Sequence, residues 1–340
     1  MKIISWNVNG LRSVYQKGFP AWLDKSGADI VCVQEVKAQA STVPQDLFSG
    51  SKYSFIANYA ERPGYSGVGI YVKEKPKKID TKLGHLRFDN EGRMVRLDYP
   101  DFTFIGLYIP NGSRDKRDMG YKLEVYRHLF EYLKSIKKKN VILAGDFNIA
   151  HEEIDLARPK ENKNNTMFTP EERKQIDTLE SLGFVDSFRL LHKEGSHYSW
   201  WPYFANARER NRSLPHDMFQ PALRGITPER EARRGGSSIS YDSKEQRSDP
   251  ALEPRPRGID SASAIPASFP PRRIASDTSS SSFLGLADAA SIAGGTYREG
   301  GSGWRIDYVF VSKALAPKLK NAFILPSVTG SDHCPVGIEI

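Results

Sequence analysis

Short apolar runs alternate with helical patterns along the first two hundred residues, and this alternation restricts the fold more than any other feature. The runs FTFIGLYI (102–109) and NVILAGDF (140–147) are nearly apolar throughout, as expected of central strands covered on both faces. The run MVRLDY (94–99) alternates between apolar and polar residues, as a strand with one solvent-exposed face does. The other expected strands are KIISW, ADIVCVQ, YSFIANY and VGIYV. The pattern predicts an α/β or α+β domain with a large sheet core.

Two helices are also clear in this part of the sequence. Apolar residues recur at helical spacing from Leu123 to Ile136, which predicts an amphipathic helix that ends in the cationic run 137–139. Thr169 and Glu172 form a capping box around Pro170, so a second helix begins there and Gly183 is placed to end it. From residue 303 onward the pattern predicts a strand, a short helix over 314–319 and a final strand VGIEI.

Residues 212–302 differ in composition from the rest of the chain. These 91 residues hold 16 Ser, 9 Pro and 9 Gly, so they have little to pack into a core. The strand and helix patterns continue on both sides of them. We therefore expect one domain over 1–340 that is interrupted by a disordered insertion at 212–302. A disordered loop, a partner-binding segment, an engineered fusion and a translated intervening sequence all remain possible origins.

Charge and composition narrow the class of protein. The formal net charge is +8, which favours a polyanionic partner but also fits a solvated surface. The two cysteines, Cys32 and Cys334, are too few for a disulfide framework, and a reducing cytosol fits them. No run approaches the roughly 18 to 20 apolar residues of a membrane span. We expect a soluble, cytoplasmic protein that does not associate with membranes.

Polar side chains stand next to the expected strands in unusual number. A single Asp after a strand is most often a turn or a helix cap, and a single His beside it is most often a structural hydrogen bonder. Side chains gathered at strand ends can instead converge on one point, where carboxylates and amides hold a hard cation such as Mg²⁺. The length of the series favours a site. Its members are Asn7, Glu35, Asp146, Asn148, Asp307, Asp332 and His333.

Seven motifs resemble, in order, the exonuclease III family of DNA repair nucleases, within the endonuclease/exonuclease/phosphatase superfamily. The resemblance covers 1–211 and 303–340. The segment HYSWWPYFANARERN followed by GWRIDY narrows it to the abasic-site nuclease branch. It implies a four-layer α/β sandwich of two packed mixed sheets flanked by helices. The motifs are SWNVNG, QE at 34–35, GVGIYV, YIPNG with Arg114, GDFN, WRIDY and SDH.

The same resemblance assigns expected roles to individual residues. Glu35 is the expected principal ligand of Mg²⁺ or Mn²⁺, with Asn7 and Asp332 beside it. Asp146 and Asn148 are expected to orient the attacking water and the phosphate, or to serve a second metal position. His333, held by Asp307, and Tyr108 are the expected groups on the phosphate. Asn111, Arg114 and Trp304 are expected to contact DNA.

The expected reaction is hydrolysis of phosphodiesters 5′ to abasic sites and removal of nucleotides from 3′ ends of duplex DNA, by a monomer. Either Asp146 or His333 can take the proton of water; Asp146 is favoured because a histidine beside a carboxylate is largely protonated. The tryptophans 200, 201 and 304 and Phe204 either form core or wall a pocket for a flipped-out deoxyribose. Alternative functions are a phosphodiesterase for RNA, phosphoinositide or sphingolipid, and a DNA-binding protein that the insertion leaves without catalysis.

Overall fold

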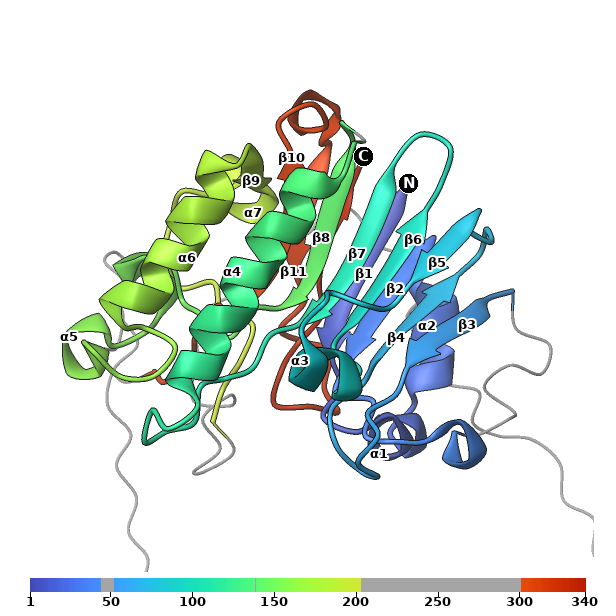
Figure 1. Ribbon diagram of the computed structural model, residues 1–340, viewed down its shortest axis with the longest axis horizontal. Helices are drawn as coiled ribbons and strands as arrows, with labels where there is room; N and C mark the ends of the chain where they lie inside the picture. The colour runs from blue at the N-terminus through green and yellow to red at the C-terminus, as the bar shows by residue number, and fades with distance from the viewer. Residues whose placement is uncertain (44–51, 138, 203–300) are drawn as a thin grey trace, which may run out of the picture. The chain divides into compact units, whose positions relative to one another are not determined.

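Each apolar run expected to be a strand forms one, and the strands make two six-stranded sheets (Figure 1). The structure is a computed structural model that describes residues 1–43, 52–137, 139–202 and 301–340. In order across the first sheet lie β11 (Asn321–Ile324), β12 (Val336–Glu339), β1 (Lys2–Asn7), β2 (Ile30–Gln34), β4 (Val68–Val72) and β3 (Ser54–Asn58). Across the second lie β5 (Lys78–Asp80), β6 (Met94–Asp98), β7 (Thr103–Tyr108), β8 (Val141–Asp146), β10 (Asp307–Ser312) and β9 (Phe184–Asp186).

Both sheets are mixed. Strands β1 and β2 are parallel, as are β7 and β8, and the remaining neighbours are antiparallel. Successive side chains of a strand point to opposite faces. Ile3 accordingly packs into the core between the sheets, whereas Ile4 packs on the outer face of the first sheet. In β8, Ile142 lies between the sheets and Leu143 faces outward.

Helices cover the outer face of each sheet. Leu11 and Phe19 pack on the first sheet, and Tyr126 and Ile176 pack on the second. Figure 1 shows α4 and α6 along the second sheet. The expected four-layer α/β sandwich is confirmed. The helices are α1 (Leu11–Gln16), α2 (Phe19–Ser26), α3 (Leu86–Asn90), α4 (Met119–Ser135), α5 (Pro159–Asn162), α6 (Pro170–Ser181) and α7 (Ser187–Leu191), with 3-10 turns η1 (Ala40–Thr42), η3 (Glu153–Asp155) and η7 (Ala316–Lys318).

The sequence signals at the helix ends match the structure. The Thr169 hydroxyl accepts from the Glu172 amide, and the Glu172 carboxylate accepts from the Thr169 amide, so the capping box of α6 is formed. Gly183 follows that helix with a φ of 94°, in the left-handed region that glycine tolerates best. The short helix expected over 314–319 is the single turn η7.

Residue contacts divide the chain into two units, Met1–Phe219 with Thr296–Ile340, and Gln220–Gly295. All described residues belong to the first unit. The expected insertion, 212–302, lies outside the described residues except for Gly301 and Ser302. Its expected disorder and the single-domain organisation stay predictions.

Candidate active site

The two sheets bring the ends of their central strands to one place. Asn7 and Gln34 are partners at the carboxyl ends of parallel strands β1 and β2, so Glu35 follows directly beside Asn7. In the second sheet Asp146, at the end of β8, is the partner of Tyr108 on one side and of Asp307 on the other. Strand register thus sets the polar side chains side by side, as the sequence pattern indicates.

The segment before β12 completes this cluster. Because β12 runs antiparallel to β1, residues 331–333 pass the carboxyl end of β1. The Ser331 hydroxyl donates to the Asn7 carbonyl over 2.8 Å. The Trp6 indole nitrogen donates to the His333 carbonyl over 3.1 Å. These bonds attach the last part of the site to the first strand of the fold.

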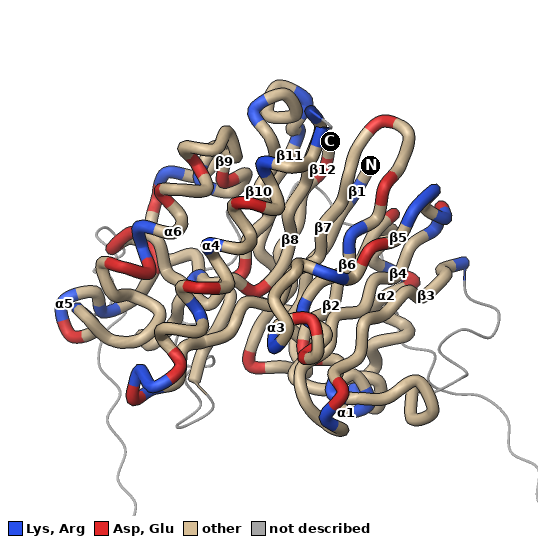
Figure 2. The backbone as a smooth tube through the Cα atoms, in the orientation of Figure 1, with Lys and Arg blue, Asp and Glu red and all other residues tan. Residues whose placement is uncertain are grey.

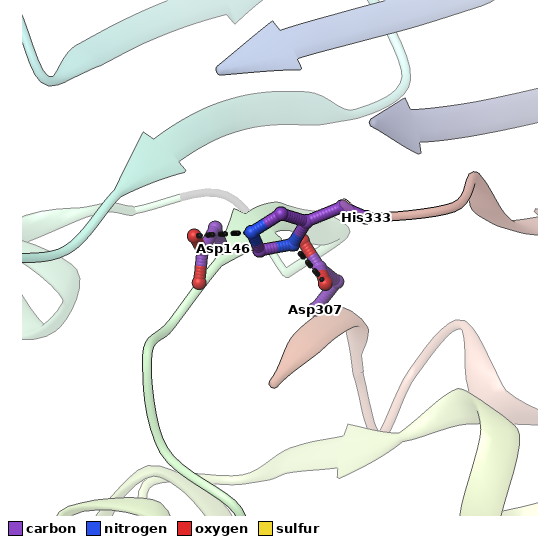
Figure 3. Close-up of side chains that lie close together, drawn as sticks. All are labelled: Asp146, Asp307 and His333. Carbon is purple, nitrogen blue, oxygen red and sulfur yellow. Dashed lines mark hydrogen bonds and ion pairs between the residues drawn. The ribbon is translucent and has the colours of Figure 1, made fainter. Parts of the chain in front are cut away.

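His333 lies between two carboxylates (Figure 3). Its Nδ1 is 2.9 Å from Asp307 Oδ2, and its Nε2 is 3.9 Å from Asp146 Oδ2. Burial alone lowers the pKa of His333, but the charge and hydrogen bond of Asp307 outweigh it and raise that pKa to about 10. Burial raises the pKa of Asp146 to about 7, and the Asp307 charge acts in the same direction. At neutral pH the imidazole is therefore a cation beside a carboxyl group poised to take a proton.

Glu35 is the centre of the other half of the cluster. Its Oε1 accepts from Asn7 Nδ2 over 3.0 Å and from the Tyr108 hydroxyl over 2.8 Å. Its Oε2 lies 2.6 Å from Lys37 Nζ. Burial alone would raise the pKa of Glu35, but Lys37 and Asn7 lower it below its usual value. Asn7 Nδ2 also donates to Asp146 Oδ2 over 2.9 Å, which joins the two halves.

Asp332 is held by Asn9, which the sequence reasoning did not assign to the site, and by Trp200, which it left open between core and pocket wall. Asn9 Nδ2 donates to its Oδ1 and the Trp200 indole nitrogen to its Oδ2, each over 3.0 Å. Burial would raise the pKa of Asp332, but the His333 charge and these two bonds lower it. Lys37 Nζ donates to Asn9 Oδ1 over 2.6 Å and so completes the link from Asp332 to Glu35. Asn9 and Lys37 each stand two residues after an expected ligand, which was the available signal.

Backbone conformation at the site is unusual. Asn9, Glu35, Lys37 and Asn148 have φ values of 47°, 55°, 49° and 52°, in the left-handed region that non-glycine residues seldom adopt. Such strain concentrates at functional sites. The Asn148 amide donates to Asp146 Oδ1 over 2.9 Å, and Asn148 Nδ2 donates to the Ile109 carbonyl over 2.8 Å. The turn after β8 is thereby closed around Asp146.

The three residues expected to contact DNA differ in exposure. Asn111 and Arg114 are exposed in the loop after β7. Trp304 is only 7% exposed and packs edge-on against Phe168 and Trp200. Trp201 is also buried, whereas Trp200 is half-buried; Phe204 lies outside the described residues. In the view of Figure 2, basic segments are interspersed with acidic ones, so charge alone does not mark a DNA-binding face.

The charge balance of the cluster fits a divalent cation. Its hydrogen bonds and ion pairs connect four carboxylates, Glu35, Asp146, Asp307 and Asp332. Among the described residues, two cationic side chains pair with these carboxylates, Lys37 and His333. One oxygen of Asp307 is buried with no hydrogen-bond partner. Such an excess of oxygen ligands is the environment that hard cations prefer. Asp146, Asp307 and His333 present ligand atoms within 4.8 Å of one another.

Comparison with known proteins decides the family. The Endonuclease/Exonuclease/phosphatase family matches residues 4–219. The chain belongs to this family. An exodeoxyribonuclease from Bacillus subtilis (strain 168) is 32% identical over 347 residues, covering 100% of this chain and 99% of the relative. A DNA-(apurinic or apyrimidinic site) endonuclease from Dictyostelium discoideum is 40% identical over 225 residues, which cover 64% of this chain and 62% of the relative. The expected resemblance to these family members is confirmed, and their names agree with the expectation of a DNA repair nuclease.

Solved structures give the same fold. An AP endonuclease from Archaeoglobus fulgidus matches with a TM-score of 0.67 at 21% identity, over 100% of this chain and 98% of that one. A 3′ phosphatase from Neisseria, solved with a product DNA hairpin, matches with a TM-score of 0.68 at 21% identity. The match covers 100% of this chain and 98% of that one. Among the described helices, none is long and apolar enough to cross a membrane.

Proposed function

We propose that this chain is a metal-dependent DNA repair nuclease, which hydrolyses the phosphodiester 5′ to an abasic site and removes nucleotides from 3′ ends of duplex DNA. The observation that carries this proposal is the Asp146–His333–Asp307 arrangement. A buried carboxyl group with a pKa of about 7 lies beside an imidazole with a pKa of about 10. Family members named for cutting DNA at abasic sites and as exodeoxyribonucleases support the choice of substrate.

In the proposed reaction Asp146 accepts a proton from the attacking water. The water oxygen forms a bond to phosphorus, and the bond from phosphorus to the 3′ oxygen breaks. The departing 3′ oxygen takes a proton from solvent water, which leaves a 3′ hydroxyl and a 5′ phosphate. A base with a pKa near the working pH is well suited to this transfer. Asn148 keeps one Asp146 oxygen fixed through its backbone amide, and Asn7 keeps the other fixed.

Protonated His333 stabilises the phosphate by donating to a non-bridging oxygen, and Asp307 holds the imidazole in the required orientation. Tyr108 donates to the same phosphate once it leaves Glu35. Asn7, Glu35 and Asp332 would hold Mg²⁺ or Mn²⁺, and Asp146 with Asn148 would serve a second position. When bound, the cation supplies positive charge that neutralises the phosphate as charge builds in the transition state.

DNA is held by phosphate contacts from Asn111 and Arg114, and Trp304 supports the wall of the abasic pocket through Trp200. The proposal places the active protein in the cytoplasm as a monomer. Phosphate contacts carry no sequence information, so cleavage is expected to depend on the lesion or the end and not on the surrounding bases.

The test is cleavage of a labelled duplex with one abasic site, and of a recessed 3′ end, in Mg²⁺ or Mn²⁺ and after chelation. We expect a metal-dependent cut 5′ to the lesion that Asp146→Asn abolishes. Asp29→Asn is the matched control, because Asp29 pairs with Lys73 outside the cluster. Tight DNA binding without cutting would identify a binding protein instead. Cleavage only of RNA, phosphoinositide or sphingolipid would identify another branch of the family.

A further inference from the structure

Lys122 is a fully buried lysine that contacts the proposed site through backbone carbonyl groups. It lies on α4, and its side chain has no solvent exposure. Its ammonium group donates to Glu172 Oε1 over 2.5 Å, to the Asn148 carbonyl over 2.7 Å and to the Asn111 carbonyl over 3.4 Å. All three donors of a lysine are therefore used within the protein.

The two carbonyl groups belong to the loops that carry the proposed site. Asn111 lies in the loop after β7, which also bears Arg114, and Asn148 lies in the turn after β8. Strands β7 and β8 are parallel neighbours, so their two loops leave the sheet at the same edge. The ammonium of Lys122 therefore links these two loops, in addition to the bond from Asn148 Nδ2 to the Ile109 carbonyl.

The cross-link acts on the residue that holds Asp146. The carbonyl that Lys122 binds and the amide that donates to Asp146 belong to the same residue, Asn148. Asn148 has left-handed backbone, which the surrounding contacts must maintain. The carbonyl and the amide belong to the two peptide planes that meet at the Asn148 Cα, so a backbone change that starts at the carbonyl has a short route to the bond with Asp146.

Glu172 keeps the ammonium in place. Its Oε1 also accepts from the Met167 amide and its Oε2 from the Thr169 amide, each over 3.0 Å, within the capping box of α6. Buried ion pairs seldom stabilise a protein more than well-packed apolar residues of the same size, because removing both charges from water is costly. Stability alone is thus a weak reason for a lysine here, and its directed bonds to two loops suggest another.

We propose that Lys122 is a positioning residue for phosphodiester hydrolysis: its buried ammonium fixes the loops after β7 and β8 relative to each other and, through the Asn148 backbone, orients Asp146. This inference rests on the proposed function. It predicts that losing the ammonium slows the chemical step more than it weakens DNA binding.

The test compares Lys122→Met with Thr169→Ala on a duplex with an abasic site. Methionine fills a similar space without charge, whereas Thr169→Ala weakens the α6 cap and leaves the bonds of Lys122 to both loops intact. A misplacement near 1 Å lowers rates by about 100-fold. We expect kcat of Lys122→Met to fall ten- to a hundred-fold by this reasoning, with a smaller change in KM, at a temperature where both variants are folded. Thr169→Ala should lower Tm and leave kcat unchanged.

A second measurement does not depend on activity. Hydrogen exchange of the Asn148 amide should accelerate in Lys122→Met and stay unchanged in Thr169→Ala. If Lys122→Met does not fold, the double variant Lys122→Met, Glu172→Gln removes both charges and takes its place. A kcat within twofold of the wild type, or unchanged exchange at Asn148, would overturn the proposal. A wild-type protein that cuts no DNA refutes the proposed function. In that case the exchange of the Asn148 amide still shows whether Lys122 positions the Asn148 backbone.

Discussion

Replacing Asp307 by asparagine tests how the site keeps His333 charged. Asparagine preserves the shape of the side chain and removes its charge. In the native protein the pKa of His333 rises from its ordinary value of 6.5 to about 10, against the effect of burial, which would lower it. A rise of this size corresponds to a preference on the order of 5 kcal/mol for the charged imidazole. Without Asp307 the buried imidazole should be largely neutral at pH 7.5.

The same substitution should also affect Asp146. Burial is the main reason that the pKa of Asp146 is about 7, and the Asp307 charge is the second. Loss of the Asp307 charge should lower that pKa, but the accompanying loss of the His333 charge should raise it, so the two effects oppose each other at Asp146. We therefore expect the alkaline limb of the pH dependence of kcat, which follows His333, to move to lower pH in Asp307→Asn. At pH 8 the rate should fall by roughly 10²- to 10³-fold, the usual cost of removing a group that stabilises the developing charge.

The assay is a pH profile of abasic-site cleavage from pH 5.5 to 10, with an NMR titration of His333 in the metal-free protein. The His333–Asp307 pair also contributes to the free energy of unfolding. The pKa of His333 is higher in the folded state than in the unfolded state, so this contribution is complete below about pH 6.5 and is lost as the pH rises through about 10. The free energy of unfolding of the variant should lack this alkaline decline. An imidazole that still titrates near 10 in Asp307→Asn would refute the reasoning, as would a lower rate with unchanged pH limbs.

Three further predictions concern the metal, the DNA contact and the insertion. Glu35→Ala should fold with a nearly native Tm but bind Mn²⁺ much more weakly, as measured by electron paramagnetic resonance; full occupancy at low Mn²⁺ would contradict its role as a ligand. Arg114→Ala should weaken binding to all duplex sequences alike and reduce the slope of log affinity against log salt by about one. Filter binding at several salt concentrations measures this slope, and an unchanged slope would contradict a phosphate contact. Replacing 212–302 by two residues should leave abasic-site cleavage intact, because no proposed site residue except the flanking Trp304 lies near its ends in the sequence; loss of folding would show that the segment is integral.

The main strands were predictable because their apolar runs are long enough to show a pattern. Strands β7 and β8 have six residues each, and the first five residues of β7 are all buried. A strand buried on both faces needs apolar residues at nearly every position, and that run is what the sequence shows. Strands β5 and β9 have three residues each, and β5 is largely exposed. Such short elements are set by pairing with a neighbouring strand and not by local pattern.

The site was predictable to the extent that it follows strand ends. Glu35 and Asp146 were found because each follows an apolar run. Register between strands is a non-local property, so the direct pairing of Asp146 with Asp307 required the structure. The same holds for Lys37, whose ammonium lies 2.6 Å from Glu35 beyond the end of β2, where both residues have left-handed backbone. Core and pocket wall were the two open alternatives for Trp304, and its contacts with Phe168 and Trp200 place it in a buried apolar cluster.

The position of β12 links protein synthesis to activity. This strand lies between β1 and β11, although β1 is made early and residues 331–339 leave the ribosome after every other part of the site. A growing chain that already contains Asn7, Glu35 and Asp146 still lacks His333 and has an open edge on β1. Such an edge pairs readily with other chains. Pairing of β12 with β1 closes that edge and also brings His333 to Asp146 and Asp307, so a chain without β12 lacks one of the groups of the proposed reaction.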